Sequence, residues 1–185
     1  PFRVDREQFR RTTYSTRGRL SRAMLALYAN QSPKDWEHHD RSVLSTVYYT
    51  LTDHPNLHHV FPLGFCEKNL TDGAKLVDSL LNIAYLTQLT NLDISDSNPV
   101  QYLKEYFEPG SEAVAASHLL PPSVIEWSYA DAMPDDALDI FIEQRLDLLL
   151  ARIQALVDPI PLEIIDSGGA GEVLSTLDSN AAQDH

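Results

Sequence analysis

The chain is poor in cysteine, in glycine-rich loops and in long apolar runs, and each shortage excludes a class of protein. The single cysteine, Cys66, excludes an internal disulfide and a cysteine-rich zinc site. The Gly168-Gly169 pair follows no predicted strand and precedes no lysine, which excludes a phosphate-binding P-loop. No apolar run approaches the roughly 18 residues that span a bilayer. We therefore expect a soluble, cytoplasmic piece of a longer protein, without membrane contact.

Positive charge is also scarce, because 14 Lys and Arg residues face 27 Asp and Glu residues, for a net charge of -13. Such a balance opposes phosphate binding by the chain as a whole. Half of the basic residues, however, are arginines within the first 22 positions: Arg3, Arg6, Arg10, Arg11, Arg17, Arg19 and Arg22. Local charge decides whether phosphate can approach a site. The arginine run is therefore interpreted either as a DNA contact or as a solvated helix face.

The spacing of apolar residues favours helices. It predicts helices over residues 6–30, 40–51, 88–93, 98–107 and 135–157. The last of these carries the clearest apolar stripe, which indicates core or partner-helix packing and consists of Leu138, Ile142, Leu146, Leu149, Ile153 and Leu156. Residues 57–61 and 82–87 are short and apolar, and they predict two strands separated by a polar loop.

Candidate chemistry is concentrated in the segment Asn56-Leu57-His58-His59-Val60-Phe61-Pro62. Adjacent residues on an extended strand point to opposite sides. A kink near Pro62 would let one imidazole reach a metal while its neighbour reaches a water, and a residue from a later helix would complete the metal shell. Phosphodiester hydrolysis needs these parts, namely a water, a base and charge stabilisation at the leaving oxygen.

The segment His58-His59-Val60-Phe61-Pro62 resembles the His-His-Ile-Phe-Pro motif of HNH nuclease domains in the GmrSD-like, modification-dependent restriction family. The resemblance spans roughly residues 20–157. Its further pieces are Asn82-Ile83, Thr90-Asn91, Ile94-Ser95-Asp96, Pro99 with Tyr102-Leu103-Lys104, His118-Leu119-Leu120-Pro121 and Phe141-Ile142-Glu143-Gln144-Arg145.

This resemblance implies roles for four side chains. His58 stands at the first metal ligand and His59 at the general base. Asn82 stands at the residue that orients the loop carrying the base, and Asn91 stands at the residue that completes the metal coordination. An amide oxygen suits Mg²⁺ better than Zn²⁺, so we expect Mg²⁺, with Mn²⁺ able to substitute.

The resemblance also implies a fold and partners. The expected fold is mainly α-helical, with a small ββα-metal insert at residues 55–96 between helical regions at 1–54 and 97–162, and a disordered tail over 163–185. Double-stranded DNA, including modified or phage DNA, is the expected substrate, with contacts from Arg17, Arg19, Arg22 and Lys68. The chain would be the nuclease effector of a bacterial anti-phage restriction system, and a sensor domain of the same protein would lie outside it.

Two departures from the family pattern favour an alternative. Leu63 stands where many members have lysine, and Leu92 stands where arginine is common. The loss of these cations favours a degenerate HNH domain that serves as a non-catalytic DNA-binding or regulatory module. A second alternative is a helical protein-interaction domain built on residues 135–157, with no nucleic acid involved.

Overall fold

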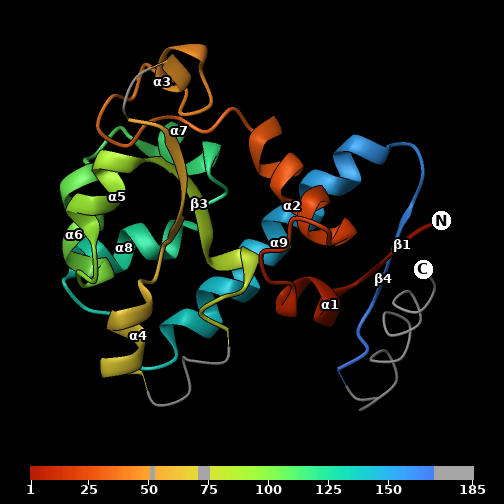
Figure 1. Ribbon diagram of the computed structural model, residues 1–185. Coiled ribbons are helices and arrows are strands. Elements are labelled where there is room, and N and C mark those ends of the chain that lie inside the picture. The colour runs from red at the N-terminus through yellow and green to blue at the C-terminus, as the bar shows by residue number, and fades with distance from the viewer. Residues whose placement is uncertain (51–52, 71–75, 169–185) are drawn as a thin grey trace, which may run out of the picture.

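The computed structural model describes residues 1–50, 53–70 and 76–168 (Figure 1). The fold is mixed α/β, with about 52% of the chain helical and two small sheets. This content is consistent with the predicted mainly α-helical fold. The helices are α1 (Arg6–Arg11), α2 (Arg19–Asn30), α3 (Thr46–Thr50), α4 (Leu63–Asn69), the 3-10 helix η2 (Leu80–Asn82), α5 (Gln88–Ile94), α6 (Pro99–Tyr106), α7 (Glu112–Ser117), α8 (Pro122–Ala130) and α9 (Ala137–Val157). The strands are β1 (Phe2–Asp5), β2 (Pro55–His59), β3 (Ile83–Thr87) and β4 (Leu162–Ile165).

Strands β2 and β3 form an antiparallel pair in which His58 lies opposite Ala84. β3 leads directly into α5, and Thr87 caps that helix because its Oγ1 accepts a hydrogen bond from the backbone N–H of Thr90. Both strands contact α5. The predicted order of strand, strand and short helix is therefore present, although β2 ends at His59 rather than at residue 61.

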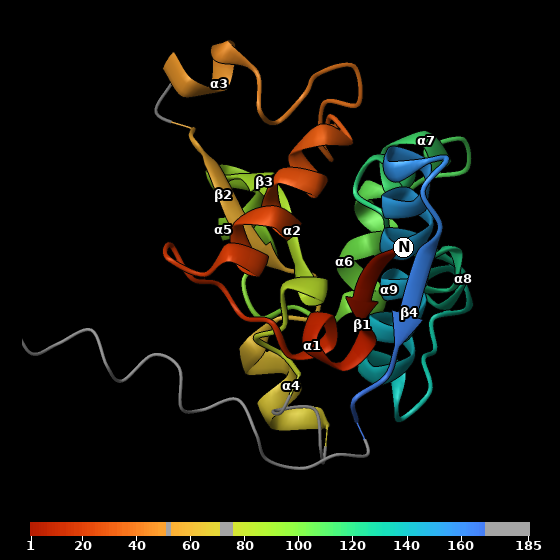
Figure 2. The ribbon, with the colours of Figure 1, turned by 90° about the vertical axis from the view of Figure 1, so that its right-hand side faces the viewer.

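The β2–β3 pair lies between two groups of helices. Helix α2 contacts β3 and η2, while α5 contacts both strands. In Figure 1, α5 and α6 lie on one side of β3 and α2 lies on the other, and in the turned view of Figure 2 α2 lies in front of the β2–β3 pair. One cluster of buried residues includes side chains from α2, η2, β3, α5 and α6, and Leu57 of β2 packs against it, so the predicted regions 1–54, 55–96 and 97–162 share a core.

Helix α9 completes the core. Five of the six residues in the predicted apolar stripe are buried, and Leu156 is exposed. The same helix buries Arg145, whose Nη1 donates to the Leu81 carbonyl at 2.7 Å and whose Nη2 donates to the His118 carbonyl at 2.9 Å. Its guanidinium also lies 4.7 Å from the centre of the Tyr28 ring. Arg145 thus fastens α9 to η2, the turn that precedes β3.

The prediction of one helix over residues 6–30 is wrong, because α1 and α2 are separated by residues 12–18. Contacts with residues distant in the sequence keep this segment from becoming helical. Thr13 forms an isolated antiparallel bridge with Ser79, and the Thr12 carbonyl accepts a hydrogen bond from Leu80 N–H at 2.7 Å. The backbone groups of residues 12 and 13 therefore pair with the segment before β3 instead of continuing a helix.

The helix predicted over residues 40–51 is wrong over residues 40–45, since α3 begins at Thr46, and residue 51 lies outside the described part of the chain. Asp40 lies exposed in a turn and caps no helix. Residues 42 and 43 are held by Pro33 and Lys34, because Lys34 bridges Ser42 and Val43 N–H donates to the Pro33 carbonyl. Val43 is fully buried there.

The polar loop predicted over residues 63–79 contains the seven-residue helix α4, which starts directly after Pro62. The disordered tail predicted from residue 163 starts too early, since β4 pairs in parallel with β1 through Ile165. Residues 169–185 of that tail lie outside the described part of the chain. Within the described ranges, no helix has the length and apolar character that a membrane crossing requires.

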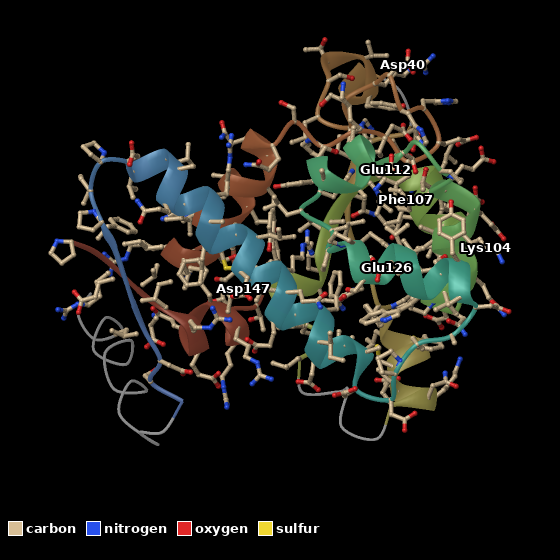
Figure 3. The ribbon with its side chains drawn as sticks, turned by 180° about the vertical axis from the view of Figure 1, so that it is seen from behind. Asp40, Lys104, Phe107, Glu112, Glu126 and Asp147 are labelled. Atoms are coloured by element: carbon tan, nitrogen blue, oxygen red, sulfur yellow. The ribbon has the colours of Figure 1, made fainter. Side chains whose placement is uncertain are left out.

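Four of the N-terminal arginines form ion pairs in the folded chain. Arg6 binds Glu143 and Asp147 of α9 at 2.9 and 2.7 Å, and Arg10 binds Asp139 and Glu143 at 2.8 Å each. Asp147 is labelled on α9 in Figure 3. Arg3 and Arg11 pair with Glu163 and Glu7. This part of the arginine run therefore holds α1 and β1 in place.

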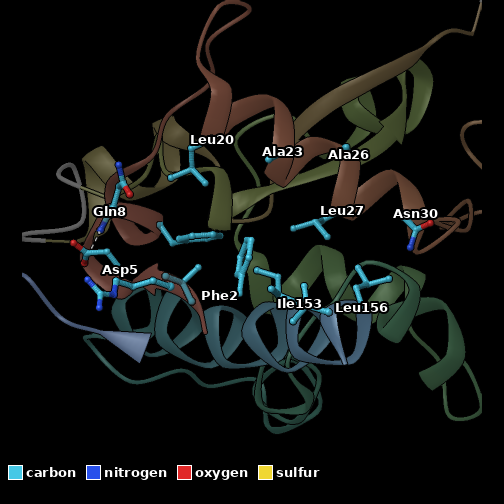
Figure 4. Close-up of a pocket in the computed structure, with 14 residues that line it drawn as sticks. Phe2, Asp5, Gln8, Leu20, Ala23, Ala26, Leu27, Asn30, Ile153 and Leu156 are labelled. Carbon is cyan, nitrogen blue, oxygen red and sulfur yellow. Dashed lines mark hydrogen bonds between the residues drawn. The ribbon is translucent and has the colours of Figure 1, made fainter. Parts of the chain in front are cut away.

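An apolar groove of about 690 Å³ lies where β1, α1, α2 and α9 meet (Figure 4). Phe2, Leu20, Leu27 and Leu156 are among its lining residues. Only Arg3 and Asp5 in that lining are ionisable. The groove therefore offers apolar surface rather than a set of reactive groups.

Candidate functional site

His58 lies on the inner side of β2. Its Nδ1 lies 2.7 Å from Oδ1 of Asn91 on α5, although the two residues are 33 positions apart in the chain. The residue is only 4% exposed. The pairing of β2 with β3, together with the direct passage from β3 into α5, brings the imidazole and the amide oxygen together.

Two aromatic side chains pack against the His58 ring. The Trp36 and Tyr102 rings meet it edge-on, with centroids at 6.2 and 6.0 Å. Nε2 of His58 is buried and has no hydrogen-bond partner in the described part of the protein. Burial lowers the pKa of His58 to about 4, with the hydrogen bond to Asn91 opposing the shift. The ring is therefore neutral near pH 7, which is the form that ligates metal ions.

His59 points the other way and is much more open, with 31% of its side chain exposed. Its Nε2 lies 3.2 Å from Oδ1 of Asp78, which belongs to the segment just before η2. The alternation of side chains along a strand thus gives two adjacent histidines different surroundings. One faces an amide and aromatic rings, and the other faces a carboxylate and solvent.

Asn82 is fully buried and joins the segment that follows His59 to the segment that precedes η2. Its Oδ1 accepts from Phe61 N–H at 2.8 Å, and its Nδ2 donates to the Phe61 and Val77 carbonyls at 3.0 and 2.9 Å. Its backbone carbonyl accepts from Val60 N–H at 2.8 Å. These bonds fix the chain immediately after His59, the position where the resemblance expects Asn82 to act.

A cavity of about 350 Å³ opens at the end of β2. Its lining residues come from β2, the start of α4 and the end of α5: Leu57, His58, His59, Pro62, Leu63, Asn91, Leu92, Ser95 and Asp96. Asp96 lies tightly against the first turn of α4, since a Cβ on Gly64 would lie 2.3 Å from its Oδ2. A Cβ at position 64 would therefore displace the exposed Asp96 carboxylate.

The residues predicted to contact DNA are only partly brought to this cavity. Lys68 lies near it, because its Nζ is 3.9 Å from Oδ2 of the cavity residue Asp96. Arg17, Arg19 and Arg22 are exposed at or near the start of α2 and make no ion pair within the described chain. None of them lines the cavity.

The donor atoms available to a cation are few. Among the described residues, no three His, Cys, Asp or Glu side chains gather closely enough to hold a metal ion by themselves. His58 Nδ1 and Asn91 Oδ1, 2.7 Å apart, are hydrogen-bonded, and Nδ1 carries the proton because an amide oxygen only accepts. A cation held by both atoms would take the place of that proton, since a histidine nitrogen ligates a metal only when it is deprotonated.

The sequence assigned no role to two site residues. Asp78 is 19 positions from His59, and only the folded chain pairs them. Tyr102 supports the segment after His59 because its hydroxyl donates to the Val60 carbonyl from α6. No family model, curated protein or solved structure matches the chain.

Proposed function

We propose that this chain is a metal-dependent DNA endonuclease of the HNH type, with β2, β3 and α5 as its ββα-metal unit. The observation that carries the proposal is the approach of His58 Nδ1 to Asn91 Oδ1 at 2.7 Å, in a cavity that His59 also lines. The resemblance of residues 58–62 to the HNH motif points to the same side chains.

In this proposal His59 is the general base. It removes a proton from a water while the water oxygen bonds to phosphorus. The bond between phosphorus and one sugar oxygen then breaks, and the leaving oxygen takes a proton from solvent. Asn82 supports this step, because its hydrogen bonds hold the chain directly after His59 and so hold the imidazole at the cavity.

His58 and Asn91 would hold the cation, Mg²⁺ or Mn²⁺, together with waters. A bound divalent cation supplies charge stabilisation at the scissile phosphate. Both side chains line the cavity, His58 is neutral, and the amide oxygen is a hard donor. Calorimetric or electron-spin titration with Mn²⁺ tests this assignment. Binding should weaken in Asn91→Ala and remain in Asn56→Ala, which removes an exposed amide from strand β2.

The DNA backbone would approach over Lys68 and, from the α2 side, over Arg17, Arg19 and Arg22. Exposed arginines without acidic partners keep their charge available to phosphate. The proposed setting is the effector domain of a bacterial anti-phage restriction protein, with recognition of modified or phage DNA assigned to a separate sensor domain.

Plasmid nicking with Mg²⁺ tests the nuclease activity. The native chain should nick, and His59→Ala should be about 100- to 10,000-fold slower, the range that general-base catalysis contributes. His38→Ala is the matched control, since it removes another exposed histidine distant in sequence from the cavity. Equal nicking by the native chain and His59→Ala would reject the mechanism.

One observation favours a second function. Leu63 and Leu92 line the cavity and are 40% and 61% exposed, at positions where the family often carries cations. Under this alternative the domain binds DNA without cutting it. Salt-dependent DNA binding by the native chain, together with no nicking under any divalent cation, would favour the alternative over the nuclease.

A further inference from the structure

The segment that carries Asp78 is anchored as firmly as the strand that carries His59. Val77 is buried, and its carbonyl accepts from the Asn82 side chain at 2.9 Å. Ser79 is buried as well, and its Oγ donates to the Arg10 carbonyl at 2.7 Å and caps η2. The two residues flanking Asp78 are therefore fixed, and the Asp78 side chain leaves this anchored turn toward solvent.

The same asparagine anchors the partner of Asp78. Val60, which follows His59, donates its N–H to the Asn82 backbone carbonyl at 2.8 Å. The His59 and Asp78 backbones are thus held from one residue, and their side chains meet at 3.2 Å. Buried hydrogen bonds thus hold the backbone next to both residues, while the Asp78 side chain itself is 67% exposed.

We infer that Asp78 is the positioning residue for His59, an inference that rests on the proposed nuclease function. A carboxylate can only accept a hydrogen bond. Its contact with Nε2 therefore requires the proton of the neutral ring to be on Nε2, which leaves Nδ1 as the lone-pair nitrogen. Asp78 thus selects the tautomer and sets the ring orientation, and Nδ1 is the atom that takes the proton from water.

Cleavage kinetics at one fixed pH test the inference. Asp78→Asn and Asp78→Ala should lower kcat by about 10- to 100-fold, the usual effect of removing an orienting partner of this kind. KM for DNA should stay the same or fall slightly, because a negative charge is lost. Asp78→Glu should recover part of the rate, since it restores a carboxylate acceptor.

Asp93→Asn is the matched control. It removes one negative charge from exposed Asp93 on α5, which does not line the cavity. The control should retain the native kcat. Native kcat in both Asp78→Asn and Asp78→Ala, with His59→Ala slow, would overturn the positioning role while leaving the nuclease proposal standing.

Nitrogen-15 spectra of the histidine rings give a readout that needs no activity. The His59 signals are assigned by their loss in His59→Ala. They should report the Nε2–H tautomer in the native chain and a mixture of tautomers in Asp78→Ala. A native ring protonated on Nδ1, or a tautomer that ignores Asp78→Ala, would overturn the inference even if the chain cuts no DNA.

Discussion

His58 and His59 are identical neighbours in the sequence, but the inner and outer sides of strand β2 give them very different surroundings. On the inner side, His58 is buried against Trp36 and Tyr102 and is neutral. On the outer side, His59 is partly open and meets a carboxylate. The comparison teaches that a strand can give two identical neighbours separate tasks, because its alternation sends one ring into the core and the other to the surface.

The inner side should be intolerant of truncation, and Trp36 gives the largest expected effect. Trp36 is 1% exposed and contacts the rings of His58, Tyr102, Phe107 and His118. Trp36→Ala should destabilise the protein by about 3–5 kcal/mol, measured by urea unfolding. Asp78→Ala, on the outer side, should change stability by less than about 0.5 kcal/mol. Similar losses of stability in Trp36→Ala and Asp78→Ala would contradict the difference drawn between the two sides of β2.

Asn82 connects the two sides, so its removal should affect both stability and chemistry. Asn82→Ala leaves the buried Val77 and Phe61 carbonyls without the donor they have now. We expect a loss of about 2–4 kcal/mol in unfolding free energy. The nicking rate per folded molecule should also fall.

Asn56→Ala serves as the comparison for Asn82→Ala, because Asn56 is an exposed asparagine on strand β2. It should unfold at nearly the native urea concentration. A native-like nicking rate in folded Asn82→Ala would contradict the role given to Asn82 in holding His59.

Acid should weaken the inner side selectively. Burial lowers the pKa of His118 from 6.5 to about 4. Between these values the unfolded chain binds more protons than the folded one, so stability is present above about pH 6.5 and is lost as pH falls toward about 4. The expected loss from His118 is about 2 kcal/mol by about pH 5. Urea unfolding at several pH values measures it.

His118→Gln isolates this contribution, since glutamine does not titrate but can still donate to the Lys34 carbonyl that His118 contacts. Its stability should fall less steeply between the same pH values. An unchanged slope would assign the acid sensitivity to other groups.

The smallest effect concerns Lys68, at the edge of the outer side. Its ion pair with Asp96 is exposed and is worth less than about 1 kcal/mol of stability. Lys68→Ala should instead weaken DNA binding several-fold and lower the slope of log affinity against log salt by about 1. Fluorescence anisotropy at several salt concentrations measures both. An unchanged slope would remove Lys68 from the DNA interface.

Local patterns in the sequence determine several elements. The stripe of residues 138–153 is buried along α9, and Asn98 with Pro99 starts α6, where Asn98 Oδ1 accepts from Val100 N–H at 3.0 Å. The strands and the short helix around the candidate site were also predictable. Their signals lie in neighbouring residues, through helical spacing, alternation and capping. His58 and Asn91 lie within hydrogen-bond distance in the fold, and their role as metal ligands stays a prediction of the resemblance.

Tertiary structure alone decided the rest. The break between α1 and α2 depends on Ser79, which lies far along the chain, and the ion pairs of Arg6 depend on α9. The meeting of Asp78 with His59 likewise depends on Asn82, which holds both segments. Such contacts join residues distant in sequence, so no local pattern records them. Buried hydrogen bonds and core packing select them only when the whole chain is folded.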